Sequence, residues 1–169
     1  MGYATDLNCC QWIPPYQMVK SAGTWTPTLA SNVYKEVRTT AAAAFNLFIP
    51  IQVSGNAVPL KNVRIKSIDV WWINATADLT SVTTVELEKM ALLAQTVAVT
   101  GAAVVTTQDT LNDTTAKRIT QASHKMTVTI TTPEWVQANT AYCLYITFDC
   151  ATTSALALFG AQVNYDLRV

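Results

Sequence analysis

The sequence has little glycine, little charge and a single histidine. Its 169 residues include 5 Gly and 1 His, and 13% of them are charged, with eleven basic side chains balancing eleven acidic ones. So few glycines make the glycine-rich loops that hold nucleotide phosphates hard to build. A chain without net charge also has no field to attract nucleic acid or an anionic membrane surface. We therefore expect neither a nucleic acid nor a membrane as a partner.

Cysteine is scarce as well. The four cysteines are Cys9, Cys10, Cys143 and Cys150. They lack the paired Cys-x-x-Cys or Cys/His spacing of a zinc site. Cys9 and Cys10 are neighbours, which is poor geometry for a disulfide between them. We interpret the four as buried, inert thiols, and we expect no metal and no cofactor.

Signals for export or membrane insertion are also missing. The first residues have neither the basic start nor the apolar run of a secretory signal, so no signal peptide is predicted. Residues 90–108 carry no charge. Their threonines and glutamines nevertheless make them too polar for a spanning helix of about 20 residues. We interpret them as a buried strand pair with a turn at Thr100-Gly101.

What the sequence does have is an excess of β-branched residues. Thr is the commonest residue with 26 copies, Val adds 17, and 50% of the chain is hydrophobic. Such side chains suit a pleated sheet and lose rotamer freedom in a helix. A chain of this length also buries a core without disulfide or metal staples. The composition therefore predicts a β domain.

Several segments alternate apolar and polar residues with a period of two, which is typical of half-buried strands. The apolar faces of these segments are Phe45, Leu47, Ile49, Ile51 and Val53; Met126, Val128 and Ile130; Tyr142, Leu144, Ile146, Phe148 and Cys150; and Ala161, Val163, Tyr165 and Leu167. In residues 60–74 the apolar positions change from odd to even numbers after Ile65. This change of phase implies a β-bulge or a strand that passes between two sheets.

Residues 1–33 differ from the rest of the chain because they have no sustained period. Pro14-Pro15 favours an extended backbone, and the large side chains Trp12, Tyr16 and Trp25 are of the kind that dominate interfaces. We predict an all-β protein. Residues 34–169 form an antiparallel two-sheet, jelly-roll-like sandwich of about eight strands. Residues 1–33 form an extended N-terminal arm whose Trp12, Tyr16 and Trp25 contact neighbouring subunits.

Residues suited to catalysis are few. His124 begins a regular strand, and we interpret it as an exposed structural residue rather than part of a Ser-His-Asp arrangement. Glu86 and Glu88 alternate with apolar residues, which indicates a solvated strand face. Asp109 and Asp113 lie in a polar stretch without the spacing of an EF-hand. We expect no catalytic residue and no enzyme activity.

The remaining tryptophans indicate an alternative class of function. Trp71 and Trp72 are adjacent in one predicted strand and so face opposite sides of a sheet, which places at most one of them in the core. Trp71 and Trp135 are therefore candidate surface aromatics. They belong either to a subunit interface or to a platform on which sugar rings stack. A carbohydrate-binding β-sandwich module is the alternative to a structural protein.

Several short segments of the sequence resemble a group of uncharacterised proteins encoded by phages and phage-like elements. These segments lie at residues 22–26, 48–51, 60–72, 76–79, 113–118, 124–129, 132–133 and 159–161. The resemblance spans nearly all of residues 20–169. It implies a jelly-roll-like structural subunit of a virion, virus-like or extracellular assembly, such as a capsid, decoration, fibre or tube protein. The partners it implies are copies of the chain itself, in a trimer or a larger or helical assembly, and other virion proteins. It carries over no functional residues.

Overall fold

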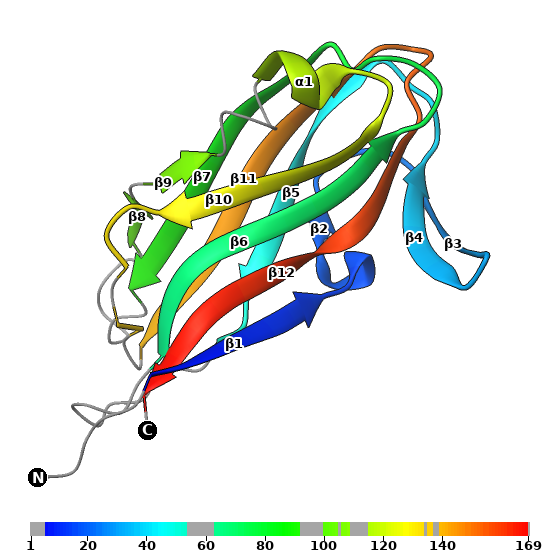
Figure 1. Cartoon of the computed structure of the whole chain (residues 1–169). Coiled ribbons are helices and arrows are strands. Elements are labelled where there is room, and N and C mark those ends of the chain that lie inside the picture. Colours follow the sequence, from blue (N-terminus) through cyan, green and yellow to red (C-terminus); the bar gives the residue numbers. More distant parts are fainter. Residues whose placement is uncertain are drawn as a thin grey trace, which may run out of the picture.

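The computed structural model describes residues 6–53, 63–91, 100–104, 106–108, 115–133, 135–136 and 139–168 of the chain. In these residues two antiparallel β-sheets pack face to face, and a single short α-helix lies at one end of the sandwich (Figure 1). The predicted all-β, two-sheet antiparallel sandwich is confirmed.

The described strands are β1 (Asp6–Ile13), β2 (Val19–Lys20), β3 (Trp25–Ala30), β4 (Val33–Arg38), β5 (Ala43–Ile51), β6 (Val63–Asn74), β7 (Ser81–Ala91), β8 (Thr100–Val104), β9 (Thr106–Gln108), β10 (Ser123–Ile130), β11 (Thr140–Cys150) and β12 (Leu156–Arg168). The 3-10 turn η1 (Pro15–Gln17) joins β1 to β2, and helix α1 (Thr115–Ile119) precedes β10. The larger sheet has the order β3-β4-β12-β6-β10-β9, with β1 also paired to β12, and the smaller sheet has the order β2-β5-β11-β7-β8.

Eight of these strands have the order of a jelly roll. In the larger sheet they run β4-β12-β6-β10, and in the smaller sheet they run β5-β11-β7-β8. The chain therefore changes sheet between β4, β5, β6 and β7, and again between β10, β11 and β12. This is the double-sheet arrangement of two Greek keys that defines a jelly roll. The other described strands, β1, β2, β3 and β9, extend the margins of the two sheets.

The core lies between the sheets and consists of the faces that the alternation predicts. The predicted apolar positions of β5, β10 and β11 are all buried, and Phe45, Leu144 and Phe148 are at most 1% exposed. Tyr165 and Leu167, near the end of β12, are only partly buried. They pair with β1 at the margin of the larger sheet, where the opposite sheet covers them less completely.

The change of phase in β6 is a β-bulge. The register between β6 and β12 shifts next to Ile65, so that Lys66 is an extra residue. The extra residue lets both Ile65 and Ile68 face the core, because it moves the alternation by one position. Strand β6 stays in the larger sheet throughout.

The residues before β4 extend the sheets of their own domain. Strand β1 pairs with β12, β2 pairs with β5, and β3 pairs with β4. The expected boundary between residues 33 and 34 falls one residue inside β4, the first jelly-roll strand, and therefore within the β3–β4 hairpin. The segment is extended, as expected. Strand β1 lies along β12 of its own chain, and Ile13 and Met18 enter the core of that chain. Contact of the segment with neighbouring subunits stays a prediction.

The turn expected at Thr100-Gly101 is wrong. Both residues lie in strand β8, where they pair with Ala91 and Met90 of β7. Thr and Gly are common in turns, but the backbone here continues as an edge strand. No helix in the described part of the chain is long and apolar enough to cross a membrane.

Candidate functional site

Exposed large hydrophobic side chains gather in one part of the chain. In the described residues they are Leu7, Trp12, Tyr16, Val19, Leu29, Val33 and Tyr34. All of them belong to β1, η1, β2 and the β3–β4 hairpin, which we call the N-terminal segment (residues 6–38). Contiguous exposed apolar surface marks places where a protein binds something. The N-terminal segment therefore contributes to the candidate site.

The register of the strands determines which residues are neighbours on the outer face of the larger sheet. Trp12 of β1 pairs with Gln162 of β12, which in turn pairs with Asp69 of β6. The next row on the same face contains Gly160 of β12 and Trp71 of β6. Side chains alternate across a strand, so these residues point away from the core.

Trp12 and Trp71 meet above Gly160, although β12 lies between their strands. Their ring centroids are 5.5 Å apart, and the ring planes are inclined at 42°. Gly160 leaves the space for the indole of Trp12, because a Cβ atom at position 160 would lie 2.4 Å from its Cζ2 atom. The ammonium group of Lys125 lies 5.4 Å from the centroid of the Trp71 ring. The two tryptophans thus form one aromatic surface with a cation at its side.

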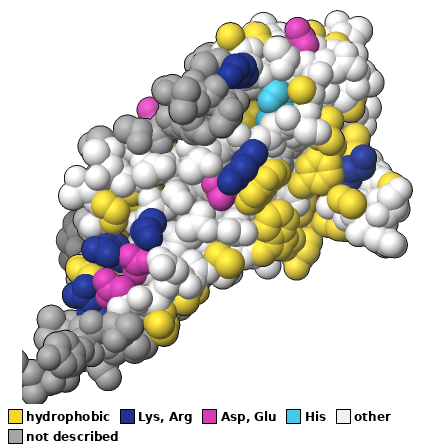
Figure 2. Space-filling view, viewed as in Figure 1, with side chains coloured by type: hydrophobic (Ala, Val, Ile, Leu, Met, Phe, Trp, Pro, Cys, Tyr) yellow, Lys and Arg dark blue, Asp and Glu magenta, His cyan; other side chains and the backbone are white. Residues whose placement is uncertain are grey.

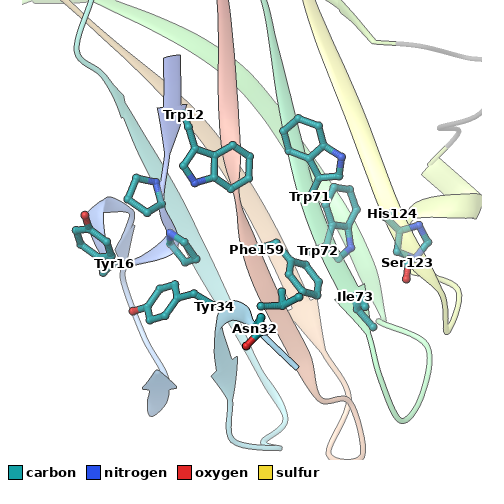
Figure 3. Close-up of a pocket in the computed structure, with 13 residues that line it drawn as sticks. Trp12, Tyr16, Asn32, Tyr34, Trp71, Trp72, Ile73, Ser123, His124 and Phe159 are labelled. Atoms are coloured by element: carbon teal, nitrogen blue, oxygen red, sulfur yellow. The ribbon is translucent and has the colours of Figure 1, made fainter. Parts of the chain in front are cut away.

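This surface is one side of a groove of about 720 Å³. The groove, which we call the aromatic groove, is lined by Trp12, Tyr16, Tyr34, Trp71, Trp72 and Phe159, together with Pro14, Pro15, Asn32, Val33, Ile73, Ser123 and His124. Figure 3 shows the indoles of Trp12 and Trp71 on either side of β12, with the Tyr16 and Tyr34 rings on the hairpin side. Figure 2 shows hydrophobic side chains gathered over this region, whereas several charged side chains gather towards the opposite end of the face.

A nearly buried ion pair holds the hairpin side of the groove in place. The Tyr16 and Tyr34 rings meet edge to face, with centroids 6.0 Å apart. The Tyr34 hydroxyl donates a hydrogen bond to Glu36 over 3.4 Å, and Glu36 forms an ion pair with Lys20. Lys20 also donates to the carbonyl oxygen of Pro15, 2.5 Å away. Burial, and then the charge of Glu36 and its hydrogen bond, raise the pKa of Tyr34 above its ordinary value.

A polar network lies beside the two tryptophans and centres on Asp69. The hydroxyl of Thr127 donates to Asp69 over 2.6 Å, and the amide of Asn164 donates to it over 3.3 Å. The Lys125 ammonium forms an ion pair with Asp69 at 3.2 Å. The amide of Gln162 donates to Asn164 over 2.8 Å. Donors and acceptors held in this way, next to aromatic rings, can exchange hydrogen bonds with hydroxyl groups of a ligand.

The three aromatic residues predicted as interface anchors occupy different environments. Trp12 is 50% exposed and Tyr16 is 63% exposed, and both line the aromatic groove. Trp25 packs edge to face on Phe45, with centroids 5.1 Å apart, and its Nε1 donates to the carbonyl oxygen of Ala22. Trp25 therefore supports its own domain. Contact of Trp12 and Tyr16 with another subunit stays a prediction.

Trp71 and Trp135 do not form a common platform. Trp135 bridges to Arg64 at the start of β6, which places it roughly 20 Å from Trp71 along the strand. The guanidinium groups of Arg64 and Arg168 lie 5.0 and 4.5 Å from the centroid of the Trp135 ring. Trp72 faces the core and is 1% exposed. The aromatic partner of Trp71 is Trp12, which the sequence pattern did not indicate.

His124 is more enclosed than the exposed residue that we expected. Its ring stacks on Trp72 with centroids 5.1 Å apart. Its Nε2 atom lies 2.8 Å from the carbonyl oxygen of Thr120 and 3.2 Å from Nδ2 of Asn74. These contacts place His124 within the structure that joins α1 to β10, which is a structural position.

The other candidate acidic residues are separate from the groove or outside the described part. Glu86 is exposed on β7 and Glu88 is half-buried on the same strand. Asp109 and Asp113 lie outside the described residues. Among the residues that the structure describes, no group of three or more His, Cys, Asp and Glu side chains is placed to hold a metal ion.

The sequence reasoning did not single out Tyr34 or Phe159, which line the groove, or Gly160, on which Trp12 lies. Gly160 did give a signal, since an isolated glycine inside an alternating strand indicates a bulge or a close approach. Both occur here, because the register of β12 shifts at Phe159 and Trp12 lies on the glycine. Tyr34 gave no signal in the sequence, because the exposure of its side chain depends on how far the β3–β4 hairpin projects.

Comparisons with known proteins do not identify a family for this chain. No family model matches the chain, and no curated protein matches it. A solved structure of a carbohydrate-binding module from the β-sandwich superfamily, reported for the promiscuous specificity of such modules, is similar at 12% identity with a TM-score of 0.37. The similarity covers 98% of this chain and 56% of that one, so this chain spans little more than half of its length. A similarity this weak says nothing about ligand or partner.

Proposed function

We propose that the chain is a structural subunit that assembles with copies of itself and catalyses no reaction. The observation that carries the proposal is the clustering of exposed large hydrophobic side chains, which in the described residues all lie between Leu7 and Tyr34. Covering apolar surface stabilises a contact by about 25 cal/mol per Å². The low charge of the chain supports the proposal too, because the centres of interfaces are depleted in charged residues.

The partner that fits this surface is a second copy of the chain. The β3–β4 hairpin projects from the sandwich beside the aromatic groove (Figure 1). It carries Leu29 at 73% exposure, whereas Val33, at 46%, lines the groove of its own chain. The groove is lined mainly by apolar side chains, and neither the groove nor the hairpin tip carries a Lys, Arg, Asp or Glu side chain. The hairpin of one subunit therefore suits the groove of the next. A head-to-tail contact of this kind builds rings or filaments.

The setting that we propose is a virion, virus-like or extracellular assembly, with the chain as a capsid, decoration, fibre or tube subunit. Jelly rolls form viral capsid domains, but they also form lectin domains and cupins, so the fold does not choose among them. The proposal of an assembly subunit, and not a lectin or a cupin, is supported by the exposed apolar surface and by the resemblance to phage-encoded proteins.

Sedimentation velocity of a surface variant tests the proposal. The double variant Tyr16→Ser/Leu29→Ser removes two exposed side chains, so we expect unchanged circular dichroism and thermal stability but a smaller sedimenting species. Tyr145→Ser is the matched control, because Tyr145 lies on the outer face of the smaller sheet, against Phe48. If the double variant assembles as strongly as the unmodified chain, this surface is not the contact.

Glycan binding is the second candidate function, and the pairing of Trp12 with Trp71 beside Gln162 and Asp69 favours it. Sugars stack on aromatic faces through their C–H groups while amides and carboxylates bind their hydroxyls. A glycan array followed by tryptophan fluorescence titration tests this candidate. We expect Trp71→Ala to abolish binding and Trp135→Ala to leave it intact. Absence of binding across the array eliminates the candidate.

A further inference from the structure

Strand β1 is a long edge strand with one open side. It pairs with β12 along its whole length, from Asp6 to Ile13, without any shift of register. In the described residues no strand pairs with its other side. Eight regular residues extend over roughly 26 Å. An edge like this leaves alternate backbone N–H and C=O groups free to pair with another chain.

The other described edges are short or interrupted, in the ways that proteins use to prevent edge pairing. Strand β2 has two residues, β9 has three and β8 has five. Strand β3 carries Pro27 in its middle, which removes one backbone donor. Strand β1 contains no proline, lysine or bulge, and its one charged residue, Asp6, is ion-paired with Arg168 at 2.7 Å. Among these edges β1 alone is left suited to pairing.

We propose that β1 pairs antiparallel with β1 of a second copy across a two-fold axis, so that two seven-stranded sheets become one continuous sheet. An antiparallel pairing is self-complementary, because each copy offers the same donors and acceptors to the other. The inference rests on the proposed self-association and names the partner and the geometry of one contact. It is separate from the hairpin contact, and an extended assembly uses both.

The two faces of β1 restrict the register of this pairing. Its even-numbered residues point outward with Trp12, and its odd-numbered residues point towards the core with Ile13. A two-fold axis perpendicular to the sheet places the outer faces of both copies on the same side. Even-numbered residues of one β1 must then face even-numbered residues of the other, and odd-numbered residues must face odd-numbered ones. One residue of β1 then lies at the two-fold axis, directly opposite the same residue of the second copy. The two registers that pair almost the whole strand place Cys9 or Cys10 there.

The register centred on Cys10 is the better of the two. It places Leu7, which is 46% exposed, opposite Ile13 of the second copy, and it leaves Asp6 with Arg168 outside the pairing. The register centred on Cys9 would place Asp6 opposite the apolar Trp12 of the second copy. Cys10 is exposed in the single chain, and Cβ atoms of facing residues in a sheet are about 5 Å apart.

Crosslinking with a short bis-maleimide tests the geometry, because this reagent joins two nearby thiols without an oxidant. The variants Cys9→Ser and Cys10→Ser each leave one thiol on β1. We expect Cys9→Ser to give a covalent dimer joined Cys10 to Cys10 in peptide mapping, and Cys9→Ser/Cys10→Ser to give none through β1. A dimer joined Cys9 to Cys9 supports the same interface in the other register. If the associated protein gives neither the Cys10–Cys10 nor the Cys9–Cys9 dimer, the inference is overturned.

A charge variant separates this inference from the proposed function. Asn8→Glu/Cys10→Glu places like charges across the axis in either register, and both positions are exposed. We expect the dissociation constant of the two-fold contact to rise at least about tenfold, which corresponds to about 1.4 kcal/mol. Thr83→Glu/Thr129→Glu adds the same charge at exposed positions of β7 and β10 and should change nothing. If the charged edge associates unchanged, the β1 contact fails while self-association stands. If the unmodified chain is a monomer throughout, the proposed function itself fails.

Discussion

The indole of Trp12 lies on Gly160 so closely that a Cβ atom at position 160 would be 2.4 Å from Cζ2 of the ring and 2.8 Å from the carbonyl oxygen of Ile13. Gly160 also has a φ of +143°, which side-chain-bearing residues rarely adopt. The glycine therefore fixes where Trp12 lies against Trp71, and with it the shape of the aromatic groove.

We predict that Gly160→Ala lowers the free energy of unfolding by about 1–3 kcal/mol, because the added methyl group must displace Trp12. Urea unfolding measures the loss, and the tryptophan emission of the folded protein should change as the indole moves. Gly101→Ala is the control, since its Cβ atom would approach only the flexible carboxylate of Glu88, at 3.3 Å. Equal stability of the two variants would contradict the packing of Trp12 on Gly160.

Phe148 tests the core. Its ring stacks on Phe45 with centroids 5.2 Å apart and meets Trp72 edge to face, and it has no exposed surface. Phe148→Ala should lower the free energy of unfolding by about 3–5 kcal/mol. Phe48→Ala, on the outer face of the smaller sheet, should cost less. An unchanged melting temperature in Phe148→Ala would mean that the faces of β11 are assigned the wrong way round.

The Lys20–Glu36 ion pair should stabilise the hairpin side of the groove. Glu36→Gln leaves the Lys20 ammonium without its counter-charge in a nearly buried position, at a cost of about 1–3 kcal/mol. A double-mutant cycle with Lys20→Met should show that the two changes are coupled. If the effects of the two substitutions on the free energy of unfolding are additive, the interaction between Lys20 and Glu36 contributes nothing to stability.

Glu36→Gln should also change the titration of Tyr34. Burial, then the charge of Glu36, raise the pKa of Tyr34, so the folded chain keeps this phenol protonated at a pH where the unfolded chain has ionised it. Stability should therefore fall as the pH rises above the ordinary tyrosine pKa. Phenolate absorbance should show one tyrosine titrating at lower pH in Glu36→Gln. Identical titrations would rule out the influence of Glu36.

The cysteines should differ in reactivity. Burial raises the pKa of Cys143 and of Cys150, and a raised pKa leaves less of the reactive thiolate at neutral pH. Cys10 is exposed. We predict that iodoacetamide modifies Cys10 first in the folded protein, and that Cys150 reacts only after unfolding, as mass spectrometry would show. Labelling of Cys150 as fast as Cys10 would contradict the burial of β11.

The sequence predicts the jelly-roll core because that information is local. The period of two marks the inner faces of β5, β10 and β11 residue by residue, and the change of phase after Ile65 marks the bulge at Lys66. The alternation of β1 is harder to read. Gln11 interrupts the apolar positions between Leu7 and Ile13, so the strand looks like an irregular arm.

The aromatic groove is not readable in the same way, because it depends on which strands become neighbours. Trp12 and Trp71 come from strands that β12 separates, and they meet only because the intervening residue is Gly160. No local pattern contains that relation. Trp25 shows the converse: its sequence context resembles that of Trp12, yet Phe45 lies within reach and Trp25 packs on its own core.

Sedimentation velocity of the unmodified chain over a wide range of concentrations tests self-assembly most directly. We predict that species larger than the monomer dominate, that they shift to smaller sizes on dilution, and that rings, filaments or closed shells are visible by negative-stain electron microscopy at the same concentrations. A single monomeric species at every concentration, with no ordered particles in the micrographs, would contradict the structural role.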